Sequence, residues 1–485
     1  MIYKNYINGK WISSSSGKTF KNINPANPTQ ILGKFQDSNK NDVDKAVQAA
    51  ESAYESWSSL PAAKRGDILY RAAHLLKENK ERLARIMTLE MGKVLKESRG
   101  DVQEAIDITE YMAGEGRRLL GHTTPSELTD KFCLTIRMPV GVFGLITPWN
   151  FPAAIPAWKI MPALICGNTI VFKPASDTPQ SAIELVKILI RAGVPKGVLN
   201  LVTGSGQGVG RPMIKHDQIQ GISFTGSKQV GEFVMQNAGL KKVGLELGGK
   251  NAIIIMDDAD LKLALDGVIW GAFGTTGQRC TAASRIIIHK KIKPKFEKML
   301  VKATKKLKLG PGIKSSTDVG PLINEKAVEK VHHYTHIGIN EGAKLLTGGK
   351  IPKKKGFYYE PTIFTDVSWN MKIAQEEIFG PSLSIIPVKD IDEAIHVCNS
   401  TPYGLSSAIY TKSLRNAFLA IEKIQAGLTY VNSSTIGSEI HLPFGGVKGT
   451  GHGREAGIEG IDEFSEIKTV YFDFSGKLQK AQGIK

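Results

Sequence analysis

Residues 141–152 read GVFGLITPWNFP, an apolar run of strand length that ends in a proline-containing aromatic loop. Three further short apolar runs follow, at 168–173, 197–202 and 221–224. The segments between and after them, at about 155–165, 178–192, 207–215 and 227–238, have helical periodicity. Strands that alternate with helices predict an α/β fold, with a parallel sheet and ligands at the carboxyl ends of its strands.

The loops at those expected strand ends carry distinctive residues. TPWNFP follows the first strand, KPAS at 173–176 the second, and FTGS at 224–227 the fourth. The last of these opens a helix, where backbone N–H groups can face a phosphate. The dinucleotide fingerprint is absent, because GSGQGVG at 204–210 has Val209 where the pattern needs its last glycine. A dinucleotide would therefore be held here in a non-standard way.

A second α/β region begins with the apolar run at 251–256. Asp260 is expected to cap the helix that leads to the loop carrying Cys280, and further α/β elements run to about 431. Cys280 follows Gly277, and Glu246 precedes paired glycines. A thiol and a carboxylate in such loops could be a nucleophile and a general base. These two residues alone do not establish a catalytic role, because a lone cysteine is usually a small buried hydrophobic residue.

The remaining chain adds helices and two alternating strands. Short strands are expected over 6–36 and helices at about 41–57, 62–90 and 95–119, with Asp42 and Pro61 as start signals. Segments 127–137 and 467–474 alternate polar and apolar residues. They could pair as an exposed arm, whose edges favour association.

Composition is that of a globular protein of two or three domains, with 485 residues and 41% hydrophobic residues. The net charge of +17 is spread along the chain, and its densest run, 353–355, lies between Pro352 and Gly356. This pattern favours attraction of anionic substrates over a nucleic-acid partner. The four cysteines have no CxxC or metal spacing, and we see neither a signal region nor a membrane span. We expect a cytoplasmic protein without a metal.

Six motifs occur together in this chain: TPWNFP at 147–152, FTGS at 224–227, LELGG at 245–249, GQRC at 277–280, EEIFGP at 376–381 and PFGG at 443–446. In this order they resemble the NAD(P)-dependent aldehyde dehydrogenase superfamily over nearly the whole length. The resemblance implies a Rossmann-like parallel-sheet cofactor domain (1–126 and 141–250), an α/β catalytic domain (251–440) and a small β oligomerisation arm (127–140 and 466–485). It also implies a homodimer or homotetramer.

The resemblance assigns the chemistry to three residues. Cys280 would attack the aldehyde to give a thiohemiacetal, and hydride transfer to the nicotinamide would leave a thioester. Asn150 would stabilise the oxyanion, and Glu246 would activate the water that releases the acid. Acyl-CoA-forming relatives generally lack this base, so the resemblance favours hydrolysis to a free carboxylate.

The cofactor contacts are also carried over by resemblance. Glu377 and Lys173 would hold the two riboses, Phe379 would pack on the nicotinamide ribose, and Ser227 would lie at the phosphate turn. The rest of the expected cleft is Thr147, Pro148, Trp149, Phe224, Gly226, Leu247 and Gly248. NAD-preferring members often carry a glutamate where this chain has Ser176, so we expect NADP to be accepted or preferred, with NAD as the alternative. Asp177 next to it could still repel a 2′-phosphate.

Phe151, Trp158 and Phe444 match an aromatic wall around the aldehyde. Arg279 precedes the nucleophile and could bind a distal carboxylate, or could form a structural salt bridge. The segments 113–116 and 152–159 resemble 2-oxoglutarate-semialdehyde dehydrogenases. We rank that semialdehyde first, succinate semialdehyde second, and glyceraldehyde, lactaldehyde or a broad range third. Rival readings are a catalytically silent member, a nucleic-acid binder and a thiol esterase.

Overall fold

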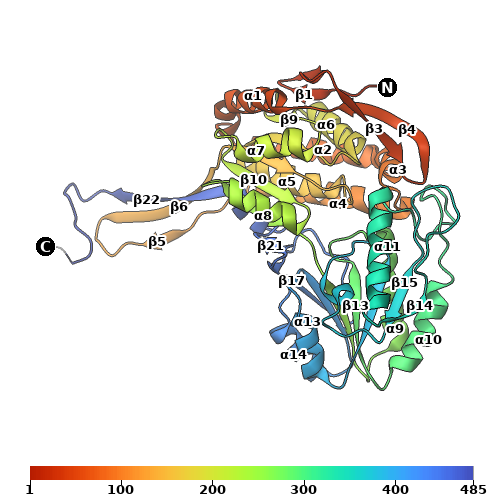
Figure 1. Ribbon diagram of the computed structural model, residues 1–485. Coiled ribbons are helices and arrows are strands. Elements are labelled where there is room, and N and C mark those ends of the chain that lie inside the picture. Colours follow the sequence, from red (N-terminus) through yellow and green to blue (C-terminus); the bar gives the residue numbers. More distant parts are fainter. Residues whose placement is uncertain (484–485) are drawn as a thin grey trace.

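The computed structural model describes residues 1–483, and two β-sheets dominate this part of the chain (Figure 1). The first sheet has eight strands in the order β2-β1-β9-β8-β7-β10-β11-β21. Strands β7 to β11 are parallel to one another, while β1 and β21 pair antiparallel at the two sides. The strands are β1 Asn5–Ile7, β2 Lys10–Ile12, β7 Val142–Ile146, β8 Thr169–Lys173, β9 Leu199–Leu201, β10 Gly221–Thr225, β11 Lys242–Glu246 and β21 Gly451–His452.

The helices around this sheet are α1 Lys40–Ser58, α2 Ala62–Glu78, α3 Lys80–Met91, α4 Leu95–Glu115, α5 Ala154–Cys166, α6 Pro179–Ala192, α7 Arg211–Lys215 and α8 Lys228–Asn237. The single helix expected at 62–90 is wrong, since the chain leaves helical geometry at Asn79, whose side chain instead donates to the carbonyl of Leu75. Asp42 does not begin α1. Asn39 caps it, and Asp42 completes a capping box from the third helical position.

Two other expected helices have different bounds. The helix expected to reach 119 ends at Glu115, and Gly206–Gly210 forms a π-helical turn before α7.

The first sheet reverses its strand order beside β7. The chain proceeds from β7 to β8 and β9 on one side, then returns to place β10 and β11 on the other. Such a switch point leaves a crevice at the carboxyl ends of the two strands between which the order reverses. The loop after β7 begins at Thr147 and the loop after β10 at Gly226, so both distinctive loops open into this crevice.

The second sheet has seven strands in the order β14-β15-β16-β13-β12-β18-β19. All neighbouring pairs are parallel except β14 with β15. Asp260 caps α9 as expected, accepting from the backbone N–H groups of Lys262 and Leu263. The strands are β12 Asn251–Ile255, β13 Ala283–His289, β14 Lys344–Thr347, β15 Thr362–Thr365, β16 Ser382–Val388, β18 Ser406–Tyr410 and β19 Leu428–Val431. The helices are α9 Leu261–Phe273, α10 Lys293–Thr304, α11 Glu325–Asn340, α12 Lys372–Gln375, α13 Ile391–Asn399 and α14 Leu414–Lys423.

A third, smaller sheet projects from the body as an arm (Figure 1). β6 Lys131–Pro139 pairs antiparallel with β22 Ser465–Asp473 from Pro139↔Ser465 to Lys131↔Asp473, and β5 Thr123–Pro125 joins the other edge of β6. The predicted pairing of these two distant segments is confirmed. The last two positions of the predicted arm, 484 and 485, lie outside the described residues.

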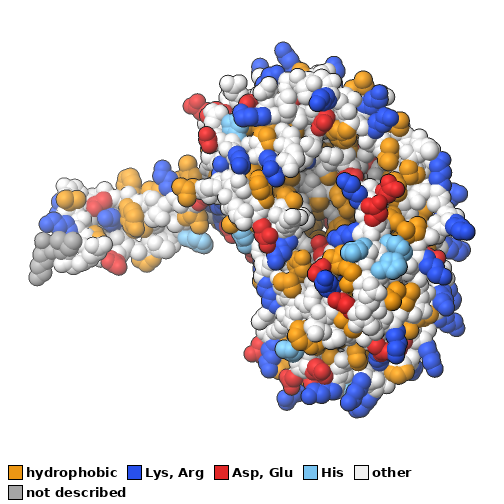
Figure 2. Space-filling view, viewed as in Figure 1, with side chains coloured by type: hydrophobic (Ala, Val, Ile, Leu, Met, Phe, Trp, Pro, Cys, Tyr) orange, Lys and Arg blue, Asp and Glu red, His pale blue; other side chains and the backbone are white. Residues whose placement is uncertain are grey.

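The remaining elements are β3 Thr19–Asn24, β4 Asn27–Gln36, β17 Tyr403–Gly404, β20 Val447–Lys448 and α15 Glu459–Glu463. The division into domains stays a prediction, and β21 adds a C-terminal segment to the first sheet that the prediction did not include. Within residues 1–483, no helix is both long and apolar enough to cross a membrane. Lys and Arg side chains are scattered over the face in Figure 2, which is hollowed between the upper and lower parts of the molecule.

Candidate active site

The loop that carries Cys280 is backbone-strained and firmly held. Thr275 and Thr276 have φ values of 51° and 59°, a left-handed conformation that is costly for β-branched residues. The N–H of Thr275 donates to Glu97 Oε1 at 2.9 Å, and Thr276 Oγ1 donates to the carbonyl of Gly320 at 3.1 Å. Gln278 Oε1 accepts from the N–H of Ile323 at 3.0 Å. These bonds fix a conformation that the loop alone would not favour.

Contacts from the start of the second sheet fix the main chain of Cys280. Asn251 Nδ2 donates to the carbonyl of Cys280 at 2.6 Å. A Cβ added to Gly249 would lie 2.6 Å from the same carbonyl oxygen. Only a glycine at 249 therefore lets the loop after β11 approach the cysteine this closely.

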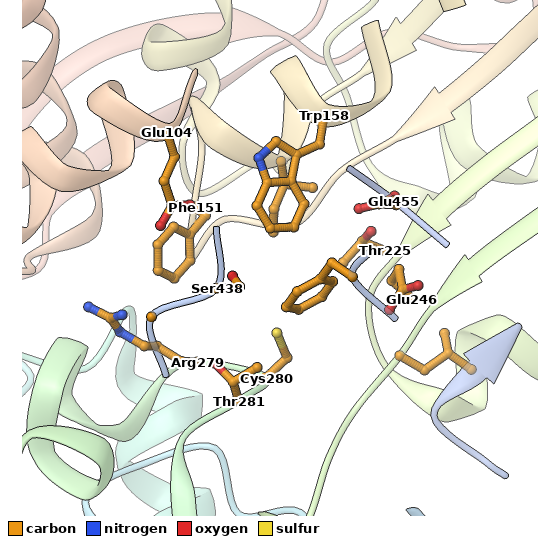
Figure 3. Close-up of a pocket in the computed structure, with 14 residues that line it drawn as sticks. Glu104, Phe151, Trp158, Thr225, Glu246, Arg279, Cys280, Thr281, Ser438 and Glu455 are labelled. Atoms are coloured by element: carbon orange, nitrogen blue, oxygen red, sulfur yellow. The ribbon is translucent and has the colours of Figure 1, made fainter. Parts of the chain in front are cut away.

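Two cavities meet at Cys280. One, of about 560 Å³, is lined by Phe151, Trp158 and Phe444 together with Glu246 and Arg279. Figure 3 shows Phe151 and Arg279 on one side of this cavity, Glu246 on the other, and the sulfur of Cys280 pointing into the space between. The second, of about 640 Å³, is lined by Pro148, Trp149, Asn150, Gly226, Ser227, Gly248, Glu377 and Phe379. Cys280, Thr225, Leu247 and Ile155 contribute to both walls.

Asn150 presents its amide next to the cysteine loop. Its side-chain Nδ2 donates to the main-chain carbonyl of Gln278 at 3.1 Å. The main-chain carbonyl of Asn150 accepts from Lys93 Nζ at 2.9 Å. Lys93 is in turn ion-paired to Asp101 at 2.6 Å, with both side chains fully buried. This clamp was not predicted from the sequence, where Lys93 just before α4 and Asp101 within it were the available signal.

Glu246 is the last residue of β11, held between Thr225 of β10 and Gly451 of β21. Its Oε2 is buried and has no hydrogen-bond partner among the described residues. Burial, with the neighbouring Glu455 carboxylate, raises the pKa of Glu246 well above its ordinary value. A Cβ on Gly445 would lie 2.8 Å from Glu246 Oε1, so this glycine leaves room beside the carboxyl group.

A buried charge network lies behind Glu246. Lys159 of α5 forms an ion pair with Glu455 and donates to Ser223 Oγ at 2.8 Å. Ser223 donates to Glu463 Oε1 at 2.8 Å, and burial raises the pKa of Glu463 to about 7. This network was not predicted from the sequence. A lone lysine in the wholly apolar helix α5 was the available signal, because a buried cation needs a partner.

Cys280 is a free, partly exposed thiol. Burial within the loop, together with the Glu246 and Glu377 carboxylates, raises the pKa of Cys280 to about 12. The side chain is therefore protonated at neutral pH in the free protein. A nucleophilic attack from this sulfur requires that its proton be taken up nearby.

The second cavity has the features of a nucleotide cleft. Glu377 Oε1 accepts from the N–H of Gly249 at 2.9 Å, and a Cβ on Gly248 would lie 2.4 Å from Glu377 Oε2. Trp149 packs edge-on against Phe379 with ring centroids 5.5 Å apart. Ser227 caps α8, so the N-terminal N–H groups of this helix face the cleft. The buried hydroxyl of Thr225 has no partner in the described part of the chain, which leaves it free for a ligand.

Four predicted cofactor residues lie outside the walls of both cavities: Thr147, Lys173, Ser176 and Phe224. Lys173 is buried at the end of β8, where it donates to the carbonyl of Pro174 at 3.0 Å, and burial lowers its pKa to about 8. Ser176 donates to the carbonyl of Gly204 at 3.0 Å. Phe224 is a core residue whose ring packs beneath Gly226.

Arg279 and Asp177 are each engaged by protein groups. Arg279 Nε donates to Thr275 Oγ1 at 2.8 Å, its Nη2 lies 3.5 Å from Glu97 Oε1, and its guanidinium carbon lies 5.2 Å from the centre of the Phe151 ring. The structural ion pair considered for Arg279 is thus present, although the side chain also lines the first cavity. Asp177 accepts from Asn324 Nδ2 at 3.2 Å.

Comparison with known proteins identifies the family. The model of the aldehyde dehydrogenase family matches residues 11–470. The chain belongs to the aldehyde dehydrogenase family. It is 43% identical over 476 residues to the alpha-ketoglutaric semialdehyde dehydrogenase of Bacillus subtilis (strain 168), covering 97% of this chain and 98% of the relative.

Two further relatives of this dehydrogenase bear on the cofactor. The NADP(+) succinate-semialdehyde dehydrogenase of Escherichia coli (strain K12) is 39% identical over 464 residues, covering 95% of this chain and 96% of the relative. A crystal structure of betaine aldehyde dehydrogenase from Staphylococcus aureus in complex with NAD+ is 36% identical, with a TM-score of 0.96, covering 100% of this chain and 97% of that chain. The dehydrogenase is thus an NAD(P)-dependent member of its family, with the α/β fold expected from the sequence.

Proposed function

We propose that this dehydrogenase oxidises an aldehyde with a distal carboxylate, first of all 2-oxoglutarate semialdehyde, to the carboxylic acid. The observation that carries the proposal is Arg279 in the wall of the cavity that also holds Cys280 and Glu246. The alpha-ketoglutaric semialdehyde dehydrogenase relative supports the substrate, and succinate semialdehyde is the second candidate.

The chain supplies three groups for the reaction. Cys280 attacks the aldehyde carbon as the C=O π bond breaks, and the thiol proton passes to the aldehyde oxygen to give a thiohemiacetal. Asn150 Nδ2 and the N–H of Cys280 stabilise the negative charge that develops on this oxygen during the attack. Glu246, which lines this cavity and whose Oε2 has no hydrogen-bond partner among residues 1–483, then takes a proton from the water that hydrolyses the thioester.

A nicotinamide cofactor in the second cavity would supply the hydride acceptor for the oxidation. The second cavity fits such a group, because its walls combine the N-terminus of α8, the orphan hydroxyl of Thr225 and the carboxylate of Glu377. Trp149 and Phe379 would flank the nicotinamide ribose. Leu247 and Gly248 would form the floor that joins this cavity to the aldehyde.

We further propose that NADP is accepted and preferred over NAD. Ser176, three positions after Lys173, stands where a carboxylate would repel a 2′-phosphate, and the Asp177 carboxylate accepts a hydrogen bond from Asn324. A 2′-phosphate would thus meet a lysine and a serine instead of a free negative charge. One relative is an NADP(+) enzyme and another was solved in complex with NAD+, which supports the acceptance of either form.

The arm supports a proposal of assembly as a homodimer or homotetramer. Its strands expose Phe132, Tyr471 and Phe472, and Phe474 follows at its end, all more than 45% accessible. Large apolar side chains on a projecting sheet favour burial against another copy.

The substrate proposal is tested by replacing Arg279 with alanine. We expect the KM for 2-oxoglutarate semialdehyde to rise about 10-fold or more, since an Arg–carboxylate pair contributes about 1.5–3 kcal/mol. The KM for propanal, which has no carboxylate, should change far less. Steady-state kinetics with both aldehydes measures the difference, and equal changes would remove the assignment of Arg279 to substrate binding.

A further inference from the structure

Glu104 is a carboxyl group in the substrate cavity for which the reaction has no use. It lies on α4, one turn beyond Asp101, and lines the same cavity as Arg279 and Cys280. Figure 3 shows it on the side of the cavity that carries Phe151 and Arg279, across from Glu246. Its carboxyl makes neither a hydrogen bond nor an ion pair with any residue from 1 to 483. The side chain is partly buried, and a carboxyl group that lines a cavity without a protein partner is available to a ligand.

We propose that Glu104 is a specificity residue that donates a hydrogen bond from its protonated carboxyl group to an oxo oxygen next to the distal carboxylate of the substrate. This inference rests on the proposed function, in which Arg279 binds that carboxylate. A 2-oxo acid semialdehyde carries both features on adjacent carbons. Arg279 would then bind the distal carboxylate while Glu104 binds the adjacent oxo oxygen.

The surroundings of Glu104 favour its protonated form. Burial, followed by the neighbouring Asp101 carboxylate, raises the pKa of Glu104 to about 7, with Arg279 and Lys93 opposing this shift and Asp107 adding to it. Tyr430 of β19 also faces this group, and Glu97 is engaged by Arg279 and the Thr275 N–H. A carboxylic acid donates to a keto oxygen, whereas a carboxylate presents only lone pairs to it.

The test uses two five-carbon semialdehydes that differ only in the oxo group: 2,5-dioxopentanoate and 5-oxopentanoate. Their kcat/KM ratio cancels every contribution that the two substrates share, including the titration of Glu246. At pH 6 we expect a ratio of about 5-fold or more in favour of the oxo compound, the value of one hydrogen bond. The ratio should fall towards 1 as the pH rises through about 7, because Glu104 loses its proton over that range.

Two variants distinguish the effect of the hydrogen bond on this kcat/KM ratio from the effect of a changed cavity shape. Glu104→Gln retains a donor that does not titrate, so its ratio should stay high at every pH. Glu104→Leu has no donor, so its ratio should be near 1 throughout. Glu110→Gln, on the exposed side of the same helix, is the matched control and should behave as wild type. Thermal unfolding of each variant verifies that it is folded.

The outcomes distinguish this inference from the function on which it rests. Equal turnover of pentanal and 5-oxopentanoate by the wild type would overturn the proposed substrate class and this inference with it. A clear carboxylate preference, with an oxo ratio that neither pH nor Glu104→Leu changes, would overturn the role of Glu104 alone. A ratio that rises above pH 7 would overturn it as well, since an ionised Glu104 would then be the favourable form.

Discussion

The two cavities that meet at Cys280 are built in different ways. The second cavity, the proposed cofactor site, is formed largely by the loops directly after β7, β10 and β11. In these loops Gly226 and Gly248 let the main chain line the cavity closely. The first cavity, the proposed aldehyde site, is formed by side chains from α4, α5, the cysteine loop and the C-terminal loops around Phe444 and Glu455. A cavity shaped by main chain tolerates few sequences, whereas one shaped by side chains can change its chemistry through single substitutions. Single substitutions can show whether the binding properties of the two cavities change independently.

Replacement of Cys280 by alanine should have the largest effect, because this residue lines both cavities and is the proposed nucleophile of the covalent step. We expect dehydrogenase turnover to fall by about 10⁴-fold or more. Cofactor affinity, measured by fluorescence titration, should be retained. Undiminished oxidation in this variant would refute the covalent mechanism.

Glu246→Gln should affect only the release of the acid. We expect kcat to fall by about 10²–10⁴-fold, while a rapid first turnover of cofactor reduction remains in stopped-flow traces. The carboxylate form is the active base, and burial raises the pKa of this group, so wild-type kcat should rise as the pH increases through that raised value. The Gln variant should lose this rise. A variant with normal steady-state rates would show that another group activates the water.

Ser176→Glu should alter the cofactor side alone. A carboxylate at this position would repel the 2′-phosphate, and we expect kcat/KM for NADP to fall by about 10-fold or more, with that for NAD maintained. The KM for the aldehyde should not change at saturating cofactor. If the wild type uses NAD strictly, the proposed preference is wrong and this substitution will have nothing to reverse.

Ser227→Ala should give the smallest change. Removal of the N-cap of α8 should lower the free energy of unfolding by about 1 kcal/mol and raise the KM for the cofactor a few-fold. Denaturant unfolding and initial-rate kinetics measure the two effects. An equal rise in the KM for the aldehyde would show that the cavities are coupled through this helix.

The sequence predicted the parallel strands around β7, the cap of α9 and the pairing of β6 with β22, because each depends on local periodicity or on a capping residue. It did not predict the break at Asn79, since helical periodicity continues across it and only the tertiary structure turns the chain there. The motif residues near Cys280 lie close together in space. Their roles stay predictions until tested.

Lys93, Lys159 and Glu104 could not be found from motifs. The two lysines contact residues far away in the sequence, Lys93 the carbonyl of Asn150 and Lys159 the carboxylate of Glu455, while Glu104 is identified only by its place in the cavity wall. The strain at Thr275 and Thr276 was equally invisible, because threonine normally avoids that conformation. Such features require knowledge of which segments meet, and this becomes known only with the fold.

The reacting groups belong to two separate sheets. Cys280 follows a helix of the second sheet, while Asn150 and Glu246 stand at strand ends of the first, and residues 247–250 form a short direct link between the sheets. On the proposed mechanism, neither sheet alone would then supply all three groups. The proposed chemistry would therefore require both sheets to keep their placement relative to each other.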